Sequence, residues 1–321
     1  MNINTIVISL GEPNSTFSEI LFKFFHSNKF KRSNKKIILV GNKLLLVKQM
    51  KKLNYKFFFN EIYKIKNAKK NKINIINVEY KFKKTFDNIS DKSNKYIKKC
   101  FDLSLKLLNE NKLMGFINGP ISKKKFLKKS YPGITEYIAK KTKSKNQVML
   151  IYNKELSVSP ITTHIPIKKV SKNITKKKII NNVNKINRFF KINLNKKPNI
   201  AILGLNPHCE TTDKVSEENK IIIPAINHLK NKKIKINGPF SADTFFFKKN
   251  IKKYNVVIGM YHDQVLTPIK TLFNFDAINI TLGLPFIRVS PDHGPNFEML
   301  GKNKSDPSSI FYAMRFFNEI K

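Results

Sequence analysis

Three of the six histidines directly follow or lie close behind short hydrophobic runs, within turn-rich segments. They are His164 in Thr-Thr-His-Ile-Pro, His208 in Gly-Leu-Asn-Pro-His, and His262 in Met-Tyr-His-Asp-Gln. Neutral imidazole is a good ligand for Zn²⁺ and similar divalent ions, and histidines from three strand ends suit a catalytic metal site that the fold assembles. The same positions also suit histidines that only form hydrogen bonds within their loops. The residues alone leave both interpretations open.

A cation at the end of a hydrophobic run is the second candidate group. Residues Asn279–Arg288 form a tight, mainly apolar run that ends in Arg288, and the turn Ser290–Gly294 follows it. An arginine here suits a bidentate contact with a carboxylate or phosphate, or it is a surface charge after a strand. Neither G-x-G-x-x-G nor G-x-x-x-x-G-K-[ST] occurs in the chain, which argues against a Rossmann dinucleotide site and a P-loop.

Short hydrophobic runs bounded by turns predict buried parallel strands, with helices between them. Residues 64–99 are rich in Lys and Asn with weak periodicity, and are expected to form surface structure or a loose insertion. Alternating strands and helices predict an α/β fold with a mainly parallel sheet, in which the chemistry gathers at the carboxyl ends of the strands. The expected strands are Ile3–Leu10, Lys36–Gly41, Met114–Pro120, Gln147–Tyr152, Asn199–Gly204 and Tyr254–Met260, and the expected helices include Ser18–Phe25, Thr175–Phe190 and Glu217–Leu229.

The length and composition fit a folded protein of two domains, or of one large one. The chain has 321 residues, 41% of them hydrophobic, which argues against wholesale disorder. No apolar stretch reaches roughly 18 residues, so no membrane span is expected. The N-terminus has no basic head before its short apolar run, so a secretory signal is not expected either. Cys100 and Cys209 form no C-x-x-C pair, which excludes a disulfide framework and favours a reducing cytoplasm.

The net charge of +41 raises the alternative of a nucleic-acid-binding protein, because Lys and Arg neutralise phosphates. Only four of the 62 basic residues are Arg, namely Arg32, Arg188, Arg288 and Arg315. Proteins that read bases directly favour Arg for its planar fork. The lysines are spread through the chain, and Lys, Asn, Ile and Phe share A/T-rich codons. A compositional bias therefore explains the charge better than selection for nucleic-acid binding.

Nine short segments occur in an order and spacing that match one enzyme family, from about residue 6 to the end of the chain. They are Gly11–Pro13, Asn118–Pro120, Gly133–Glu136, Thr162–Pro166, Gly204–His208, Asn237–Thr244, Tyr261–Gln264, Asn279–Arg288 and Asp292–Gly294. Together they resemble the 4-hydroxythreonine-4-phosphate dehydrogenase family, NAD-dependent enzymes of pyridoxal-phosphate biosynthesis. One such segment would be weak support, whereas nine in register are strong support.

The resemblance implies two α/β/α domains with mainly parallel sheets and an interdomain cleft, as in isocitrate and isopropylmalate dehydrogenases. The first domain is expected to be discontinuous, with residues 1–145 plus 270–321 and an NAD loop. The second, residues 146–269, is expected to hold the metal ligands and the dimer interface. The resemblance further implies a homodimer with its active site at the subunit interface, and neither a specific nucleic acid nor a membrane as partner.

By motif match, the resemblance also assigns site residues and cofactors. The cofactors are NAD(P) and one divalent metal per subunit, with Zn, Mg and Co as candidates. Asp243 and Asp263 are the catalytic candidates. Either could orient a metal ligand or accept the proton of the substrate hydroxyl. The remaining assignments are metal binding by His164, His208 and His262, substrate binding by Thr135, Lys270, Asn279 and Arg288, and cofactor binding by His293 and Gly294.

The implied reaction oxidises the C3 hydroxyl of 4-phosphooxy-L-threonine, and the resulting 2-amino-3-oxo acid then loses CO₂ to give 3-amino-2-oxopropyl phosphate. The chain departs from the family pattern in three places. Asn14–Ser18 replaces a Gly-rich loop, Ile134 replaces a substrate-contacting His, and Pro295-Asn296 replaces a Thr-Ala pair. These departures keep a second function open, namely a basic nucleic-acid-binding protein on a retired dehydrogenase scaffold.

Overall fold

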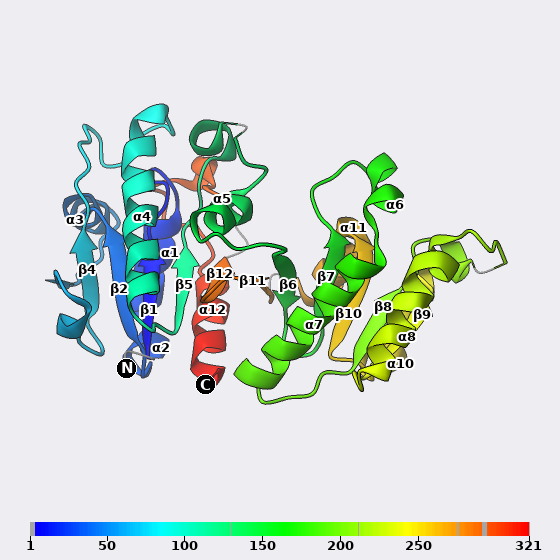
Figure 1. The fold of residues 1–321 in the computed structure, drawn as a ribbon. Helices are drawn as coiled ribbons and strands as arrows, with labels where there is room; N and C mark the ends of the chain where they lie inside the picture. Colours follow the sequence, from blue (N-terminus) through cyan, green and yellow to red (C-terminus); the bar gives the residue numbers. More distant parts are fainter. Residues whose placement is uncertain (1–3, 129, 211, 275, 291–293, 321) are drawn as a thin grey trace. The chain divides into compact units, whose positions relative to one another are not determined.

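The chain divides into two compact units, each built around six of the strands (Figure 1). The computed structural model describes residues 4–128, 130–210, 212–274, 276–290 and 294–320. The first unit comprises Met1–Ser144 and Leu284–Glu319, and the second comprises Lys145–Gly283 with Ile320–Lys321. The chain therefore returns to the first unit at residue 284, later than the expected residue 270. The reason is that β11 (Ile278–Leu282) pairs antiparallel with β6 (Val148–Tyr152) and so stays in the second unit.

The sheet of the first unit is parallel throughout. Its inner strands are near-continuous apolar runs because parallel strands are buried on both faces, and Ile6, Val7 and Ile8 are all 0% exposed. In spatial order the strands are β3 (Phe59–Glu61), β4 (Ile73–Asn77), β2 (Lys36–Gly41), β1 (Thr5–Ser9), β5 (Gly115–Asn118) and β12 (Ile287–Ser290).

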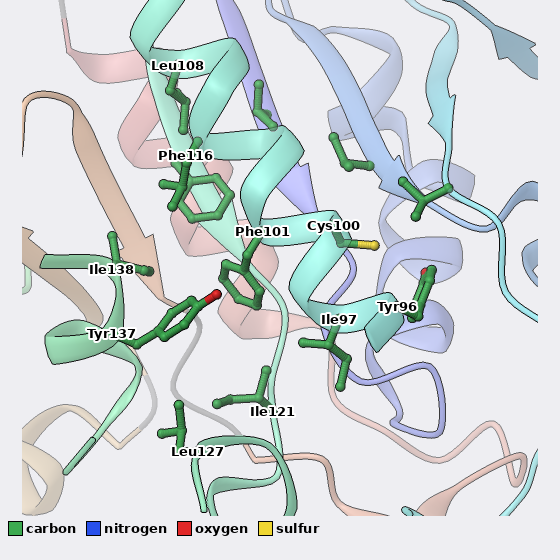
Figure 2. Close-up of a cluster of buried hydrophobic side chains, with 14 residues drawn as sticks. Tyr96, Ile97, Cys100, Phe101, Leu108, Phe116, Ile121, Leu127, Tyr137 and Ile138 are labelled. Carbon is green, nitrogen blue, oxygen red and sulfur yellow. The ribbon is translucent and has the colours of Figure 1, made fainter. Parts of the chain in front are cut away.

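Helices cover this sheet and pack on it through apolar faces. Figure 2 shows Tyr96, Ile97, Cys100 and Phe101 of the helix α4 gathered with Phe116 of β5 and other buried side chains. Burial raises the pKa of the Cys100 thiol to about 12, which leaves it unreactive. The helices of this unit are α1 (Phe17–His26), α2 (Asn28–Lys31), α3 (Lys43–Lys52), α4 (Asn94–Glu110), α5 (Ile134–Lys141) and α12 (Ser308–Glu319).

The expectation of a loose insertion over residues 64–99 is wrong for two of its parts. β4 lies inside the sheet between β3 and β2, and the first turns of α4 belong to the core. The prediction failed partly at Asn74, because a polar residue here suggested surface structure. Its side chain is 0% exposed. Its side-chain amide donates to the backbone oxygens of Ile37, Lys69 and Lys72. A buried amide whose hydrogen bonds are made costs little, so a polar residue fits a central strand.

The second unit contains a mixed sheet. β6 is antiparallel to both of its neighbours, whereas the four following strands are parallel. The order is β11, β6, β7 (Ser157–Thr162), β10 (Val256–Tyr261), β8 (Ile200–Leu203) and β9 (Ile236–Phe240). The helices are α6 (Val170–Asn173), α7 (Lys176–Asn193), α8 (Ile223–Asn231), α9 (Ala242–Phe245), α10 (Lys248–Ile251) and α11 (His262–Phe273).

The predicted class, α/β with a mainly parallel sheet, is confirmed. The six expected strands correspond to β1, β2, β5, β6, β8 and β10, and the three expected helices correspond to α1, α7 and α8. α8 is preceded by a π-helical turn, Glu218–Ile222, within the range expected as one helix. Over the described ranges, no helix combines the length and the apolar character that crossing a membrane requires.

Candidate active site

The strand order of the second unit places the loops of the three candidate histidines at one edge. β7, β10 and β8 are parallel neighbours, so their carboxyl ends lie side by side. His164 follows the end of β7 by two residues, and His262 is the first residue of α11, directly after β10. His208 lies in the 3₁₀ turn Pro207–Cys209 that follows β8. The expected placement at strand ends is therefore correct.

Two of these histidines come together. The ring centroids of His164 and His262 are 5.6 Å apart. His262 Nδ1 lies 2.7 Å from Asp263 Oδ1, and the Thr162 hydroxyl donates to the backbone oxygen of Met260 at 2.7 Å, which ties the ends of β7 and β10 together. A hydrogen bond from His262 Nδ1 to the carboxylate would leave Nε2 as the nitrogen that could bind a metal, an arrangement common around bound metals.

The third histidine, His208, lies near a carboxylate from another segment of the chain. Its Nδ1 lies 4.0 Å from Asp243 Oδ2, and both side chains are largely exposed. The pKa of the Asp243 carboxyl is lowered, chiefly by the hydrogen bond from the Ser241 hydroxyl and further by His208. Where the chain is described, no three side chains among His, Cys, Asp and Glu are arranged to hold a metal ion. The described residues thus bring two of the three histidines next to each other without completing a set of three ligands.

The backbone at these loops is unusual for residues other than glycine. His164 has φ 48°, His208 has φ 55°, and Cys209 has φ 56°. Left-handed backbone costs about 1–2 kcal/mol for a residue with a Cβ, although His tolerates it better than most residues. Strain of this kind concentrates at functional sites, where the surrounding structure holds it in place.

A buried carboxylate, Glu218, holds the loop that carries His208. Its Oε1 accepts hydrogen bonds from the backbone N–H groups of Leu205 and Asn206, at 2.7 and 2.9 Å, and its Oε2 accepts from the Asn206 amide at 2.8 Å. A Cβ at Gly204 would lie 2.9 Å from the same carboxylate, so the glycine permits the close approach. Glu218 is 0% exposed. The sequence does not reveal its role, because an acidic residue at this position is also typical of the exposed face of a helix.

Replacing Glu218 by Gln is expected to lower the free energy of unfolding by about 1.5–3 kcal/mol, because an amide cannot accept all three of these hydrogen bonds. Metal affinity should fall by about tenfold as the His208 loop loosens. Urea denaturation and metal titration measure the two effects. The exposed Glu155 of the same unit provides the matched control, since Glu155→Gln should stay within about 0.5 kcal/mol of the parent. Equal behaviour of the two variants would contradict the assigned role.

In the first unit, Arg288 of β12 is buried and hydrogen-bonded, with 1% of its surface exposed. Its Nε donates to Asn118 Oδ1 and its Nη1 donates to Thr135 Oγ1, each at 2.8 Å. Burial lowers the pKa of the guanidinium to about 10, while Glu136 acts in the opposite direction. The alternative of a surface charge after a strand is therefore wrong. Asn118, for which the sequence predicts no individual role, orients the guanidinium.

The loops after β1 and β5 pack closely beside this cluster. The Glu12 N–H donates to the backbone oxygen of Pro120 at 2.9 Å, and a Cβ at Gly11 would lie 2.4 Å from that oxygen. Gly11 also has φ +68°, so it needs glycine for two reasons. Asn14, in the loop that departs from the family pattern, accepts the N–H of Asp87 at 3.0 Å. This hydrogen bond holds the loop to the segment around Asp87.

The other predicted site residues are placed separately. Lys270 is exposed on α11, and Asn279 is half-buried in β11, both in the second unit. Gly294 is exposed, with no atom within 4 Å of a Cβ built on it. The following Pro295 accepts the Thr16 N–H at 3.1 Å, which joins this segment to the loop after β1. His293 lies outside the described residues.

Comparisons with known proteins agree with this architecture. The family model described as "Pyridoxal phosphate biosynthetic protein PdxA" matches residues 33–317. A 4-hydroxythreonine-4-phosphate dehydrogenase of Sulfurihydrogenibium sp. (strain YO3AOP1) is 40% identical over 313 residues, which cover 96% of each chain.

Solved structures extend the likeness to the fold. The crystal structure of 4-hydroxythreonine-4-phosphate dehydrogenase from Klebsiella pneumoniae superposes with a TM-score of 0.83 at 25% identity, covering 98% of each chain. Isocitrate dehydrogenase from Methylococcus capsulatus, at 8% identity and a TM-score of 0.50 over 98% of this chain and 85% of its own, shares the fold alone. The chain therefore belongs to the 4-hydroxythreonine-4-phosphate dehydrogenase family, as its nine sequence segments predicted.

Proposed function

We propose that this protein oxidises the C3 hydroxyl of 4-phosphooxy-L-threonine with NAD(P)⁺ in pyridoxine 5′-phosphate biosynthesis. The product, 2-amino-3-oxo-4-phosphooxybutanoate, then decarboxylates to 3-amino-2-oxopropyl phosphate. The observation that carries the proposal is the pairing of His164 with His262 at the carboxyl edge of a parallel sheet, with Asp263 on the second nitrogen of His262. Family membership supports the substrate and favours an enzyme over the nucleic-acid-binding alternative.

The donor set fits one divalent metal per subunit, with Zn, Mg and Co as candidates. His164 and His262 would hold it together, and His208 would be the third ligand. A bound metal supplies positive charge, which lowers the pKa of a substrate hydroxyl and polarises the carbonyl of the oxidised product. The described part of one chain brings no three potential ligands together, which supports a homodimer in which the site is completed at the subunit interface, with His208 contributed by the second copy of the chain.

The chain's own residues orient the substrate and its ligands. The Thr135 oxygen accepts from Arg288, so its hydroxyl proton remains to be donated to a substrate oxygen. Arg288 and Lys270 offset the charge of a phosphorylated, carboxylated substrate, and Asn279 adds a neutral hydrogen-bonding group. Asp263 orients His262. Asp243 lies farther from its histidine, with its Oδ2 4.0 Å from His208 Nδ1, and its lowered pKa favours the charged carboxylate beside that ring.

The nucleotide is assigned to the segment around Gly294 in the first unit, with His293 beside it in sequence. Two observations support this assignment. Gly294 is open to approach by a ligand, and its neighbour Pro295 is fixed to the loop after β1 through the Thr16 N–H.

An absorbance assay for NADH formation with 4-phosphooxy-L-threonine tests the proposal. Turnover is expected with the metal-loaded protein, and it should stop when a chelator is added and return when Zn²⁺, Mg²⁺ or Co²⁺ is restored. Running the assay with NAD⁺ and NADP⁺ in parallel identifies the preferred nucleotide. Metal-loaded protein that binds no substrate and reduces neither nucleotide would contradict the proposal.

Replacing Ile134 by His is expected to raise kcat/KM by about tenfold, because a hydrogen bond to a charged group is worth about 1.5–3 kcal/mol. Ile134 is the first residue of α5, beside Thr135, and its side chain packs against the apolar cluster of the first unit. Steady-state kinetics measure the gain, and metal content should be unchanged. Ile134→Ala, which loses the packing without adding a donor, is the control and should not gain activity.

A change below about threefold in Ile134→His would mean that the site has been rebuilt around the isoleucine. Lys123 and Lys124, exposed at the start of the π-helical turn Lys123–Leu127, are then the candidates for the substitute contact. Truncating either one to Ala would reveal it as a rise in KM.

A further inference from the structure

A pocket of about 410 Å³ lies in the first unit between the α1–α2 region and one face of α12. α2 ends at Lys31 and β2 begins at Lys36, so this region lies at the amino ends of the strands. The loops with Gly11 and Asn118 are at the carboxyl ends, at the opposite side of the unit, as Figure 1 shows. The pocket is therefore separate from the candidate active site, and its volume suits a small molecule.

The wall of this pocket is aromatic and apolar. Phe24 of α1 is 1% exposed, and Phe311 and Tyr312 of α12 are half-buried beside it. The ring centroids of Phe24 and Phe311 are 5.6 Å apart in an edge-to-face arrangement, which fixes the wall. Such a surface prefers a ligand with a flat apolar ring.

The charged groups of the lining are mainly cationic. Lys29, Arg32 and Arg315 stand against a single carboxylate, Glu319, so the lining carries a net charge of +2. Lys29 Nζ is held 4.5 Å from the centre of the Phe311 ring, and Arg315 Nε is 3.2 Å from Glu319 Oε1. Among the carboxylates of the described residues, none lies within ion-pair distance of Arg32. This charge matches a dianion such as a phosphate monoester, which carries nearly two negative charges near neutral pH.

The choice of arginine strengthens this interpretation. The chain has 58 lysines and only four arginines, so a surface cation of this protein is almost always Lys. Arg288 lies in the candidate active site, and two of the remaining three, Arg32 and Arg315, line the same pocket. Arg presents a planar fork that binds phosphate oxygens in pairs, which Lys cannot do.

We propose that this pocket binds a small aromatic phosphate monoester, with the ring on the wall of Phe311 and Tyr312 and the phosphate at Arg32 and Arg315. The Ser33 oxygen, which accepts the Lys35 N–H, retains a hydroxyl proton to donate to the phosphate. The proposal does not depend on the reaction at the other side of the unit.

Calorimetric titration of the full chain with phenyl phosphate at physiological salt tests the proposal. One site per chain is expected, with inorganic phosphate bound at least about tenfold more weakly because it lacks the ring. Arg32→Gln and Arg315→Gln should each weaken phenyl phosphate binding by about tenfold or more. Arg188→Gln removes the same charge from an exposed position on α7, and it should change the dissociation constant by less than about twofold.

Three results would overturn the proposal. Equal weakening in all three arginine variants would mean that the net charge alone attracts the anion. Equal affinity for inorganic and phenyl phosphate would remove the role of the aromatic wall. Weakening by Thr135→Val would place the ligand in the candidate substrate site. Because Arg32 and Arg315 are exposed, their variants should fold, and unchanged melting temperatures provide the check.

Discussion

The His262→Ala variant is expected to lose about 10³-fold or more in kcat/KM and most of its bound metal, which corresponds to about 4 kcal/mol of transition-state stabilisation. His262 lies beside His164, with their ring centroids 5.6 Å apart. A site with three histidine ligands has no redundant one. Steady-state kinetics and metal analysis of the purified variant measure the two losses.

Two further variants provide comparisons for His262→Ala. Asp263→Asn should have an intermediate effect, and His228→Ala should have none. Asp263→Asn keeps the ligand but weakens its orientation, so a loss of about 10- to 100-fold in activity or affinity is expected. His228 is a half-buried residue of the helix α8 and does not follow the carboxyl end of a strand, so its removal should leave metal content unchanged. Full metal stoichiometry in His262→Ala would exclude His262 from the site.

Mixed dimers test which chain supplies each ligand. If His164 and His262 come from one copy and His208 from the other, a dimer of one His262→Ala and one His208→Ala chain contains one intact site. Such mixtures should recover activity, whereas mixtures of His164→Ala and His262→Ala should recover none, because both of their sites lack a ligand. The opposite pattern, in dimers shown to form, would place all three histidines differently.

The central strands and the histidine positions could be predicted from the sequence because both follow from local pattern. A parallel strand buried on both faces must be apolar along its length, which makes β1, β2 and β10 visible. The carboxyl ends of neighbouring parallel strands meet at one edge, so histidines that follow such strands, such as His164 and His262, are brought together by topology alone.

The residues that the sequence did not reveal depend on partners distant in the chain. Asn74 fits a central strand because the carbonyl of Ile37 accepts its amide. Glu218 holds the His208 loop through backbone N–H groups twelve or thirteen residues away. The burial of Arg288 required Asn118 and Thr135, each more than 150 residues away. Hydrogen bonds of this kind leave no periodic signal, so only the fold shows which polar residues are satisfied inside it.

Arg288→Lys is expected to lower kcat/KM by about 10²-fold and the melting temperature by about 5 °C, although it keeps the positive charge. Arg288 holds Asn118 through Nε and Thr135 through Nη1 at the same time, and a lysine ammonium cannot reproduce this geometry. A buried acceptor that loses its donor costs about 1–3 kcal/mol. Kinetics with 4-phosphooxy-L-threonine and thermal unfolding measure the two losses.

Thr135 variants separate binding from stability in this cluster. Thr135→Val keeps the shape but removes the hydroxyl, so it should raise KM for the phosphorylated substrate with a smaller loss of melting temperature, and Thr135→Ser should restore binding because it restores the hydroxyl. Arg188→Lys on the exposed face of α7 is the matched control for the change of side chain and should leave both quantities unaltered. If Arg288→Lys behaved like Arg188→Lys, charge alone would suffice at this position. The paired hydrogen bonds of the guanidinium would then have no part in holding the substrate site.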